Sequence, residues 1–400
     1  MSGAVFTEDM RSTHTIILPE MLEYHFPILK AALNIGGYKC EILSNNGKSV
    51  INTGKSYAHN DMCFPAIAII GQMIDALKSG LYDPEKIAFM LPQAGGACRA
   101  GNYFHLLKKA LEKAGYKNVP VISLNLNGIN SQPGFKITLP MIKAAVYSVL
   151  CGDLLMHLYQ QIKPYENKKG ETDLLLEYWQ KKLYQKISNG ISRHKLKVQF
   201  YNILNDFSAV KITKTNRRKI GIAGELYVKY CKIGNLGLED FLLKNNCEYR
   251  MTGFSIYALY NVESVLYDNK SSELLKKGAR IVLKLLKTLY DDLAKAVSEY
   301  SAFSPMPYYS EFSDKNALSK ECISGDGWLI SAESAVLIEN GYKNIILLNP
   351  FGCLVSHINC KGIASAIRSN YNNASVTSIE CDSDTSKALF HSRVHMAIGI

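Results

Sequence analysis

The sequence of 400 residues is long enough for two to three domains of about 100–200 residues each. Hydrophobic residues make up 47% of it and charged residues 20%, so the chain can bury a large core. That composition excludes a disordered tail, a collagen-like fibre and a disulfide-stapled mini-protein. The net charge of +11 comes without an arginine-rich arm, so it does not call for a nucleic-acid partner.

The cysteines and the apolar stretches predict a cytoplasmic protein. The ten cysteines are scattered, and no two of them form a C-x-x-C pair. Met1 to Ser12 lack the apolar core of a secretory signal. The longest apolar stretches, Phe64–Ile74 and Ala144–Cys151, fall short of the ~18 residues that span a bilayer. We therefore expect reduced cysteines, and neither a membrane nor a nucleic acid as a partner.

The first third of the chain alternates strand-like and helical stretches. A helix is expected over Tyr103–Ala114, ended by Gly115. Such alternation is typical of a parallel sheet covered on both faces. The expected strands are Thr15–Pro19, Tyr38–Leu43, Lys86–Pro92 and Val119–Asn125.

The alternation stops in the middle of the chain and then restarts. The middle is helical and rich in tyrosine, and it ends in a basic stretch from Arg193 to Lys219. That stretch is either a solvated helix and linker or a docking face for an acidic partner. Further strands are expected at Lys219–Gly224, Cys247–Met251, Asn344–Asn349 and Ser375–Glu380, with a helix at Glu239–Asn245. The sequence thus predicts an α/β domain at 1–135, a helical segment at 136–216 and a second α/β domain at 217–400.

Several familiar motifs are absent or incomplete. Gly47–Ser49 and Gly54–Ser56 end like a phosphate-binding loop, but Ile42 and Ser49 stand where its first glycine is required. No G-x-G-x-x-G follows a strand, and neither G-x-S-x-G nor H-E-x-x-H occurs. We therefore expect this chain to bind no nucleotide.

Three cysteines share one structural situation. Cys98 and Cys353 each follow a predicted strand through a glycine-containing turn, and Cys63 opens a predicted helix. Backbone N–H groups at a helix start favour a thiolate, and open α/β sheets bind ligands beyond the carboxyl ends of their strands. The glycines would let the backbone approach a bulky inorganic group. The residues alone leave two alternatives open: buried inert thiols, or ligands of a metal cluster.

Several segments resemble one family along essentially the whole chain, in collinear order. The chain resembles the 2-hydroxyacyl-CoA dehydratase and benzoyl-CoA reductase subunit family. Within it, the chain is closest to the branch associated with activator ATPases, and it is similar to double-cubane cluster proteins. The matching segments are Phe6–Met10, Thr15–Met21, Cys63–Ala66, Leu91–Tyr103, Gly152–Leu155, Lys163–Glu166, Gly221–Glu225, Gly327–Glu333 and Asn349–Cys353.

The resemblance implies an iron–sulfur protein. It implies two flavodoxin- or Rossmann-like domains whose cysteines Cys63, Cys98 and Cys353 hold a [4Fe–4S] cluster or a double-cubane [8Fe–9S] cluster. A separate ATP-hydrolysing activator with its own iron–sulfur cluster would inject a low-potential electron. In the dehydratases that electron reaches a thioester carbonyl, and a ketyl radical forms. The implied function is a reductase, or a lyase component of the dehydratase type, acting on a small substrate such as an acyl-CoA.

The resemblance also has gaps. Family members are usually paired, so we expect a homodimer or a heterodimer with a related subunit. The usual Gly-Lys-Gly after the third cysteine reads Cys360-Lys361-Gly362, and Cys360 and Cys322 are the candidates for additional ligands of a double cubane. The alternative function is a non-catalytic electron relay or scaffold that serves an activator ATPase.

Two histidines lie near these cysteines in the sequence. His59 precedes Cys63 by four residues, and His357 follows Cys353 by four. A zinc site with mixed Cys and His ligands is therefore an alternative to a cluster.

Charged and aromatic residues in the motifs also allow two interpretations each. Arg99 could offset the charge of a cluster or form an ordinary surface ion pair. Glu225 could donate a proton or bind a metal, or it could simply favour the start of a helix. We expect Trp328 and Glu333 to open and solubilise a helix.

Overall fold

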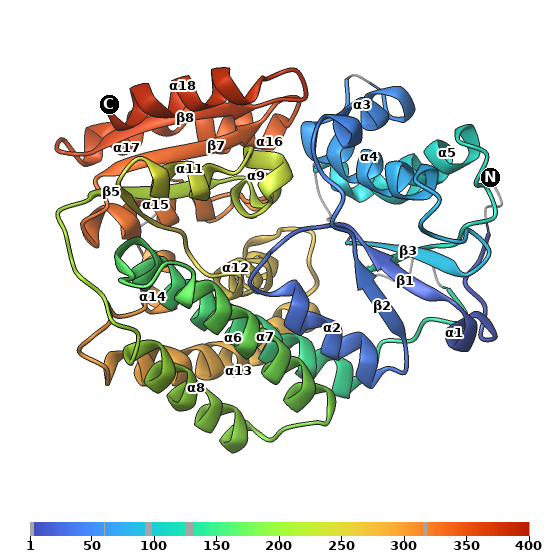
Figure 1. Ribbon diagram of the computed structural model, residues 1–400, viewed down its shortest axis with the longest axis horizontal. Helices are drawn as coiled ribbons and strands as arrows, with labels where there is room; N and C mark the ends of the chain where they lie inside the picture. The colour runs from blue at the N-terminus through green and yellow to red at the C-terminus, as the bar shows by residue number, and fades with distance from the viewer. Residues whose placement is uncertain (1–3, 60, 93–97, 125–131, 315–317, 400) are drawn as a thin grey trace.

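The computed structural model describes residues 4–59, 61–92, 98–124, 132–314 and 318–399. It contains two four-stranded sheets, and every strand pairing in both is parallel (Figure 1). The first sheet has the order β2-β1-β3-β4, from β1 (Thr15–Leu18), β2 (Lys39–Ile42), β3 (Ile87–Pro92) and β4 (Val121–Leu124). The second has the order β6-β5-β7-β8, from β5 (Arg218–Gly224), β6 (Cys247–Arg250), β7 (Asn344–Pro350) and β8 (Ser375–Cys381).

The predicted α/β fold class is therefore confirmed, and all eight expected strands are present. The agreement follows from the apolar runs: Ile87 to Leu91 of β3 are all buried, as expected where helices cover both faces of a sheet. Both sheets have a flavodoxin-like strand order. In that order the connections reverse direction between β1 and β3, and again between β5 and β7. Asn125, the expected end of the fourth strand, lies outside the described residues.

The helices form three groups. Those of the first α/β unit are α1 (Met10–Thr13), α2 (Phe26–Ile35), α3 (Lys48–Tyr57), α4 (Phe64–Lys78), the 3-10 turn η1 (Arg99–Asn102) and α5 (Tyr103–Lys113). Those of the second are α9 (Leu226–Tyr230), α10 (Lys232–Asn235), α11 (Leu238–Lys244), α15 (Leu329–Glu339), α16 (Leu354–Ser356), the π-helical turn η3 (His357–Lys361), α17 (Ala364–Asn370) and α18 (Lys387–Ile398). The rest form a helical layer: α6 (Leu139–Ile162), η2 (Lys163–Tyr165), α7 (Glu171–Ser188), α8 (Arg193–Ser208), α12 (Phe254–Tyr267), α13 (Glu273–Ser298) and α14 (Tyr309–Asp314).

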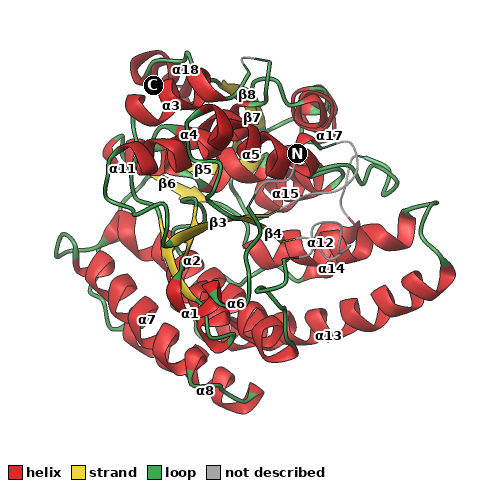
Figure 2. Cartoon of the chain, turned by 90° about the vertical axis from the view of Figure 1, so that its right-hand side faces the viewer, coloured by secondary structure: helices red, strands yellow, loops and turns green. Residues whose placement is uncertain are grey.

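The helical layer is built from two separate stretches of the chain. Helices α12 to α14 are inserted between β6 and β7, yet α12 and α13 pack against α6, and α13 also packs against α8 (Figures 1 and 2). By length and composition α6 could cross a membrane, but most of it is buried inside the protein, as in a core helix. It packs against α2 of the first α/β unit and against β6 of the second, and so joins the two units.

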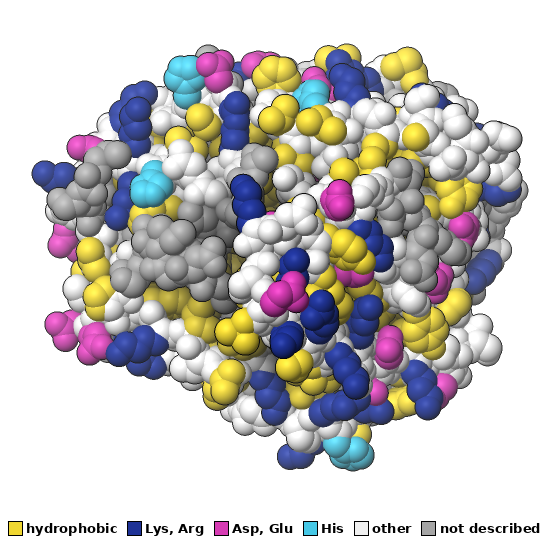
Figure 3. All heavy atoms as spheres, turned by 180° about the vertical axis from the view of Figure 1, so that it is seen from behind, with side chains coloured by type: hydrophobic (Ala, Val, Ile, Leu, Met, Phe, Trp, Pro, Cys, Tyr) yellow, Lys and Arg dark blue, Asp and Glu magenta, His cyan; other side chains and the backbone are white. Residues whose placement is uncertain are grey.

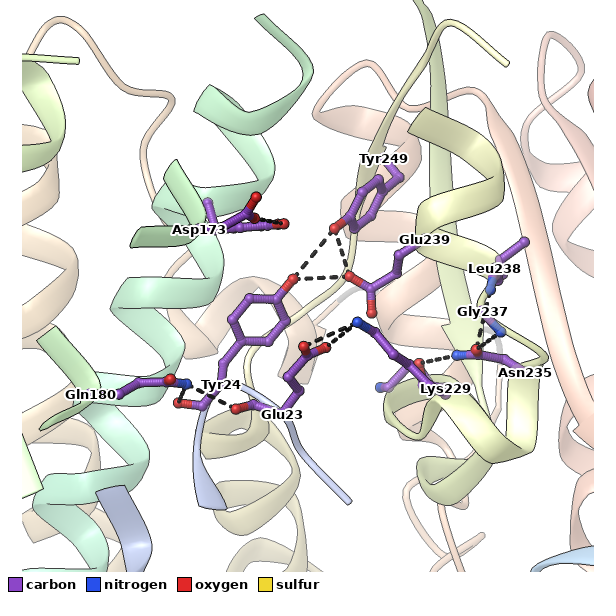
Figure 4. Close-up of polar contacts among 12 residues, drawn as sticks. Glu23, Tyr24, Asp173, Gln180, Lys229, Asn235, Gly237, Leu238, Glu239 and Tyr249 are labelled. Carbon is purple, nitrogen blue, oxygen red and sulfur yellow. Dashed lines mark hydrogen bonds and ion pairs between the residues drawn. The ribbon is translucent and has the colours of Figure 1, made fainter. Parts of the chain in front are cut away.

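A buried polar network also joins the two units (Figure 4). Tyr24, between β1 and α2, donates a hydrogen bond to Glu239 of α11 at 3.0 Å, and Tyr249 of β6 donates to the same carboxylate at 2.6 Å. At the edge of this network, Lys232 and Glu23 form an ion pair at 2.9 Å. Burial raises the pKa of Glu239 to about 7. The contact between the two units is thus sensitive to the protonation of one carboxyl group.

Candidate functional site

Each of the three motif cysteines directly precedes a helical segment, as the sequence predicts. Cys63 is the N-cap of α4, Cys98 that of η1 and Cys353 that of α16. Cys353 lies just past the end of β7, and Cys98 follows β3. The predicted glycine-rich turn over Gln93–Ala97 lies outside the described residues, as does Asn60 of the segment before Cys63.

The turns that carry Cys63 and Cys353 touch each other, although they belong to different α/β units. The N–H of Phe64 donates to the carbonyl of Phe351 at 3.0 Å. Gly352 has a φ of +71°, and a Cβ placed on it would lie 3.2 Å from the Cα of Cys63. Glycine is required there because the backbone conformation disfavours other residues and leaves little space for a side chain.

Cys98 is coupled electrostatically to the same region. Tyr103 of α5 is buried, and its hydroxyl lies 2.9 Å from the Cys63 sulfur. Burial raises the pKa of Tyr103, and negative charge on Cys63 and on Cys98 raises it further. Charge on Cys353 likewise raises the pKa of Cys98. The three thiols therefore lie within electrostatic reach of one another.

The thiols hold their protons more tightly than the sequence predicts. Burial raises the pKa of Cys98 to about 12 and that of Cys353 to about 11, and it also raises the pKa of Cys63. Backbone N–H groups at the helix starts act in the opposite direction, but burial outweighs them. The expected stabilisation of thiolates by helix starts is present, but it is too small to offset the effect of burial on the pKa of the thiols. A metal cation deprotonates thiols that it coordinates, which would remove the burial penalty.

Two carboxyl groups border the thiols. Glu225 accepts a hydrogen bond from the N–H of Val228 at 3.1 Å and so caps α9. Burial is the main cause of the raised pKa of each of the three cysteines, and the negative charge of Glu225 raises each of them further. Asp326 is buried, and burial followed by the charge of Glu225 raises its pKa well above the ordinary value. Burial also raises the pKa of Glu225. The two groups therefore release their protons at a higher pH than exposed carboxyls do.

A buried ion pair lies near these carboxyls. The ammonium of Lys229 lies 2.7 and 2.9 Å from the two carboxylate oxygens of Glu333, and the hydroxyl of Thr252 donates to the same carboxylate. The expectation that Trp328 and Glu333 solubilise a helix is wrong. Helix α15 is buried from Leu329 to Ile338, and Trp328, at its start, is fully buried.

The histidines and the arginine point elsewhere. His59 is exposed and lies 3.3 Å from Asp61, whereas His357 donates from Nδ1 to the carbonyl of Cys353 and lies 3.2 Å from Glu380. Arg99 donates to the carbonyl of Asp61. None of these contacts supports the zinc alternative with His59 and His357 as ligands.

Within the part of the chain that the structure describes, no three His, Cys, Asp or Glu side chains lie close enough together to hold one metal ion. Thiolates around a four-iron core stand apart by the width of that core, so a cluster does not need side chains gathered as closely as a single ion does. The neighbouring Tyr103 hydroxyl adds a hydrogen-bonding contact to the Cys63 sulfur.

Three groups at this site were not singled out from the sequence as part of it. The hydroxyl of Tyr103 was part of a motif but carried no assigned role. Asp326 stands between Gly325 and Gly327, which have φ values of +58° and +41°, so this conformationally unusual turn was the available signal. Lys229 gave none, because an isolated lysine in a short helix is ordinarily exposed.

A scan against protein-family models and a search of curated proteins both find no match for this chain. The family resemblance therefore stays a prediction from the motifs.

Proposed function

We propose that the chain is the cluster-bearing component of a low-potential reductase or dehydratase of the 2-hydroxyacyl-CoA dehydratase type. In this proposal Cys63, Cys98 and Cys353 bind an iron–sulfur cluster, [4Fe–4S] or double-cubane. A separate ATP-hydrolysing activator supplies the electrons, and a small substrate such as an acyl-CoA is reduced or dehydrated.

The observation that supports this proposal most directly is the meeting of cysteine-bearing turns from both sheets. Cys63 and Cys353 approach each other through the Gly352 contact, and Cys98 interacts electrostatically with Cys353. Inert core thiols would not require a positive-φ glycine to bring two N-caps of different α/β units together. When bound, the cluster supplies one-electron chemistry at low potential.

The chain's own residues would manage protons and charge around that group. Glu225 and Asp326, whose pKa values are raised, can keep or take up protons when negative charge is delivered to the thiols and release them when that charge is withdrawn. The hydroxyl of Tyr103 would donate to the Cys63 sulfur once that sulfur is a thiolate ligand, and Lys229 is held by Glu333. Burial of these groups keeps water away from the reacting region.

The test is electron transfer into the anaerobically purified chain. We expect the visible absorption of the cluster to bleach when the cognate activator, ATP and a reductant are all present, and to persist when any one is left out. A bleached chain that converts no acyl-CoA would favour the relay alternative over the enzyme. An absorption that never responds to activator and ATP would contradict both.

A further inference from the structure

Helix α13 carries an uncovered apolar stripe. Its C-terminal half packs into the helical layer, but Leu274, Ile281 and Leu285 in the N-terminal half are 82%, 72% and 58% exposed. These residues are seven and four positions apart, so they share one side of the helix. Leu275 and Val282 are also exposed and widen the stripe. Large aliphatic side chains concentrated on one exposed helix mark a surface that something covers.

A basic strip lies beside this stripe. Lys277, Arg280 and Lys284 follow one another at helical spacing on an adjoining side and are exposed. From 273 to 290 the helix has one acidic residue, Glu273, which pairs with Lys276 at 3.8 Å. The exposed half of α13 is therefore apolar on one side and cationic on the next.

The stripe sits on a projecting hairpin. Figure 2 shows α12 and α13 reaching out from the body of the molecule, joined at the tip just before Glu273. On the face toward which the hairpin points, Lys and Arg side chains gather among apolar ones in the lower central part of Figure 3. Nearer the body, an apolar groove of about 150 Å³ continues this surface between α6, α12 and α13, lined by Val146, Val149, Ala258 and Leu286 among others.

The charge of the strip decides what covers the stripe. A symmetric second copy would bring Lys277, Arg280 and Lys284 close to their own equivalents, and like charges across an interface are unfavourable. Protein–protein hot spots are also enriched in aromatic residues, whereas this stripe is wholly aliphatic. Aliphatic side chains that enter the acyl boundary, with adjacent lysines and arginines that reach anionic headgroups, are typical of a helix lying on a membrane surface.

We propose that the N-terminal half of α13 docks the protein peripherally on an anionic lipid surface. The stripe enters the headgroup–acyl boundary, and the basic strip binds acidic headgroups. This differs from the expectation that the chain has no membrane partner. The sequence of α13 is equally compatible with a helix whose apolar sides are all covered by protein, so the pattern alone did not indicate an exposed stripe. The proposal is independent of the cluster, since none of these residues lies among the thiols.

The test is flotation of the full chain with vesicles of phosphatidylcholine, with and without phosphatidylglycerol. We expect binding only to the vesicles that contain phosphatidylglycerol, and loss of that binding at high salt. The pairs Ile281→Gln with Leu285→Gln, and Lys277→Gln with Lys284→Gln, should each weaken binding by about tenfold or more. The matched control pair on α7, Leu174→Gln with Lys181→Gln, should bind like the wild type.

Three outcomes would overturn the proposal. One is a wild-type chain that does not float with anionic vesicles. Another is equal loss of binding in the α7 control pair. The third is a chain that does not bind vesicles but forms a dimer by light scattering, where the pair Ile281→Gln with Leu285→Gln dissociates that dimer. The stripe would then be an interface between copies.

Discussion

The backbone of Gly352 lies against that of Cys63, with an added Cβ only 3.2 Å from the Cys63 Cα. This contact joins the turn after β7 of the second sheet to the start of α4 beside the first sheet. It makes the candidate site a property of how the two units pack, because neither unit alone contains both turns. The close approach of the turns that carry Cys63 and Cys353 therefore depends on the absence of a side chain at Gly352.

Replacing Gly352 by alanine should disturb both folding and cluster binding. The positive φ costs about 1–2 kcal/mol for any other residue, and the new methyl group also meets the backbone of Met62 and Cys63. Gly80→Ala is the matched control, since its φ of +73° is nearly the same and nothing lies within 4 Å of its Cβ position. Urea unfolding should show a larger loss for Gly352→Ala, which alone should lose iron. Equal losses of stability, with iron retained in both, would show that the contact has no role.

Breaking the buried pair of Lys229 and Glu333 should destabilise the fold strongly. Lys229→Met leaves a carboxylate without its partner in the interior, which costs about 3–5 kcal/mol. The double variant with Glu333→Leu should recover much of that loss. Lys181→Met, which removes an exposed pair at 3.9 Å, should change the free energy of unfolding by less than about 1 kcal/mol. A single variant at Lys229 that is as stable as this control would refute the buried pairing.

The stability of the chain should depend on pH through Glu239. Its pKa of about 7 in the folded state lies above the ordinary value of 4.5, so the folded state binds the proton more tightly than the unfolded state. The stabilising effect is complete below the ordinary pKa and is lost as the pH rises through the folded-state pKa. The free energy of unfolding should fall by about 3 kcal/mol over that range. Glu239→Gln should remove this part of the pH dependence, measured as the difference from wild type in urea unfolding at several pH values. Glu112→Gln, at an exposed site, should leave the profile unchanged, and identical profiles for wild type and Glu239→Gln would contradict the assignment.

Tyr103→Phe should change the cluster's redox potential more than the fold. The hydroxyl lies 2.9 Å from the Cys63 sulfur, and hydrogen bonds to sulfur help to set the potentials of such clusters. Losing a donor leaves the reduced, more negative state less stabilised, so the potential should become more negative. Stability should fall by about 1 kcal/mol. Tyr82→Phe, which removes a hydroxyl bonded to Glu41 away from the thiols, should leave the potential unchanged, and a Tyr103→Phe potential equal to that of the wild type would contradict the contact.

The sequence predicted local structure well because local signals carry it. The runs around Ile87 and Ile345 are apolar and bounded by turns, so both strands were found, and Cys63 was placed correctly at the start of its helix. Burial of Glu333 was missed, because helix α15 is covered by segments distant in the sequence. The sharing of Glu239 by Tyr24 and Tyr249 was missed for the same reason. Contacts across units depend on packing that no local pattern encodes.

The most direct test of the account is the iron and acid-labile sulfide content per chain after anaerobic purification. The wild type should carry both in near-equal amounts, and Cys63→Ser, Cys98→Ser and Cys353→Ser should each lose the cluster or alter its spectrum, because a hard alkoxide replaces a soft thiolate. Cys40→Ser, in β2 of the first sheet, should keep the wild-type content. If all three site variants keep full iron and unchanged spectra, these cysteines are not ligands and the central claim is wrong.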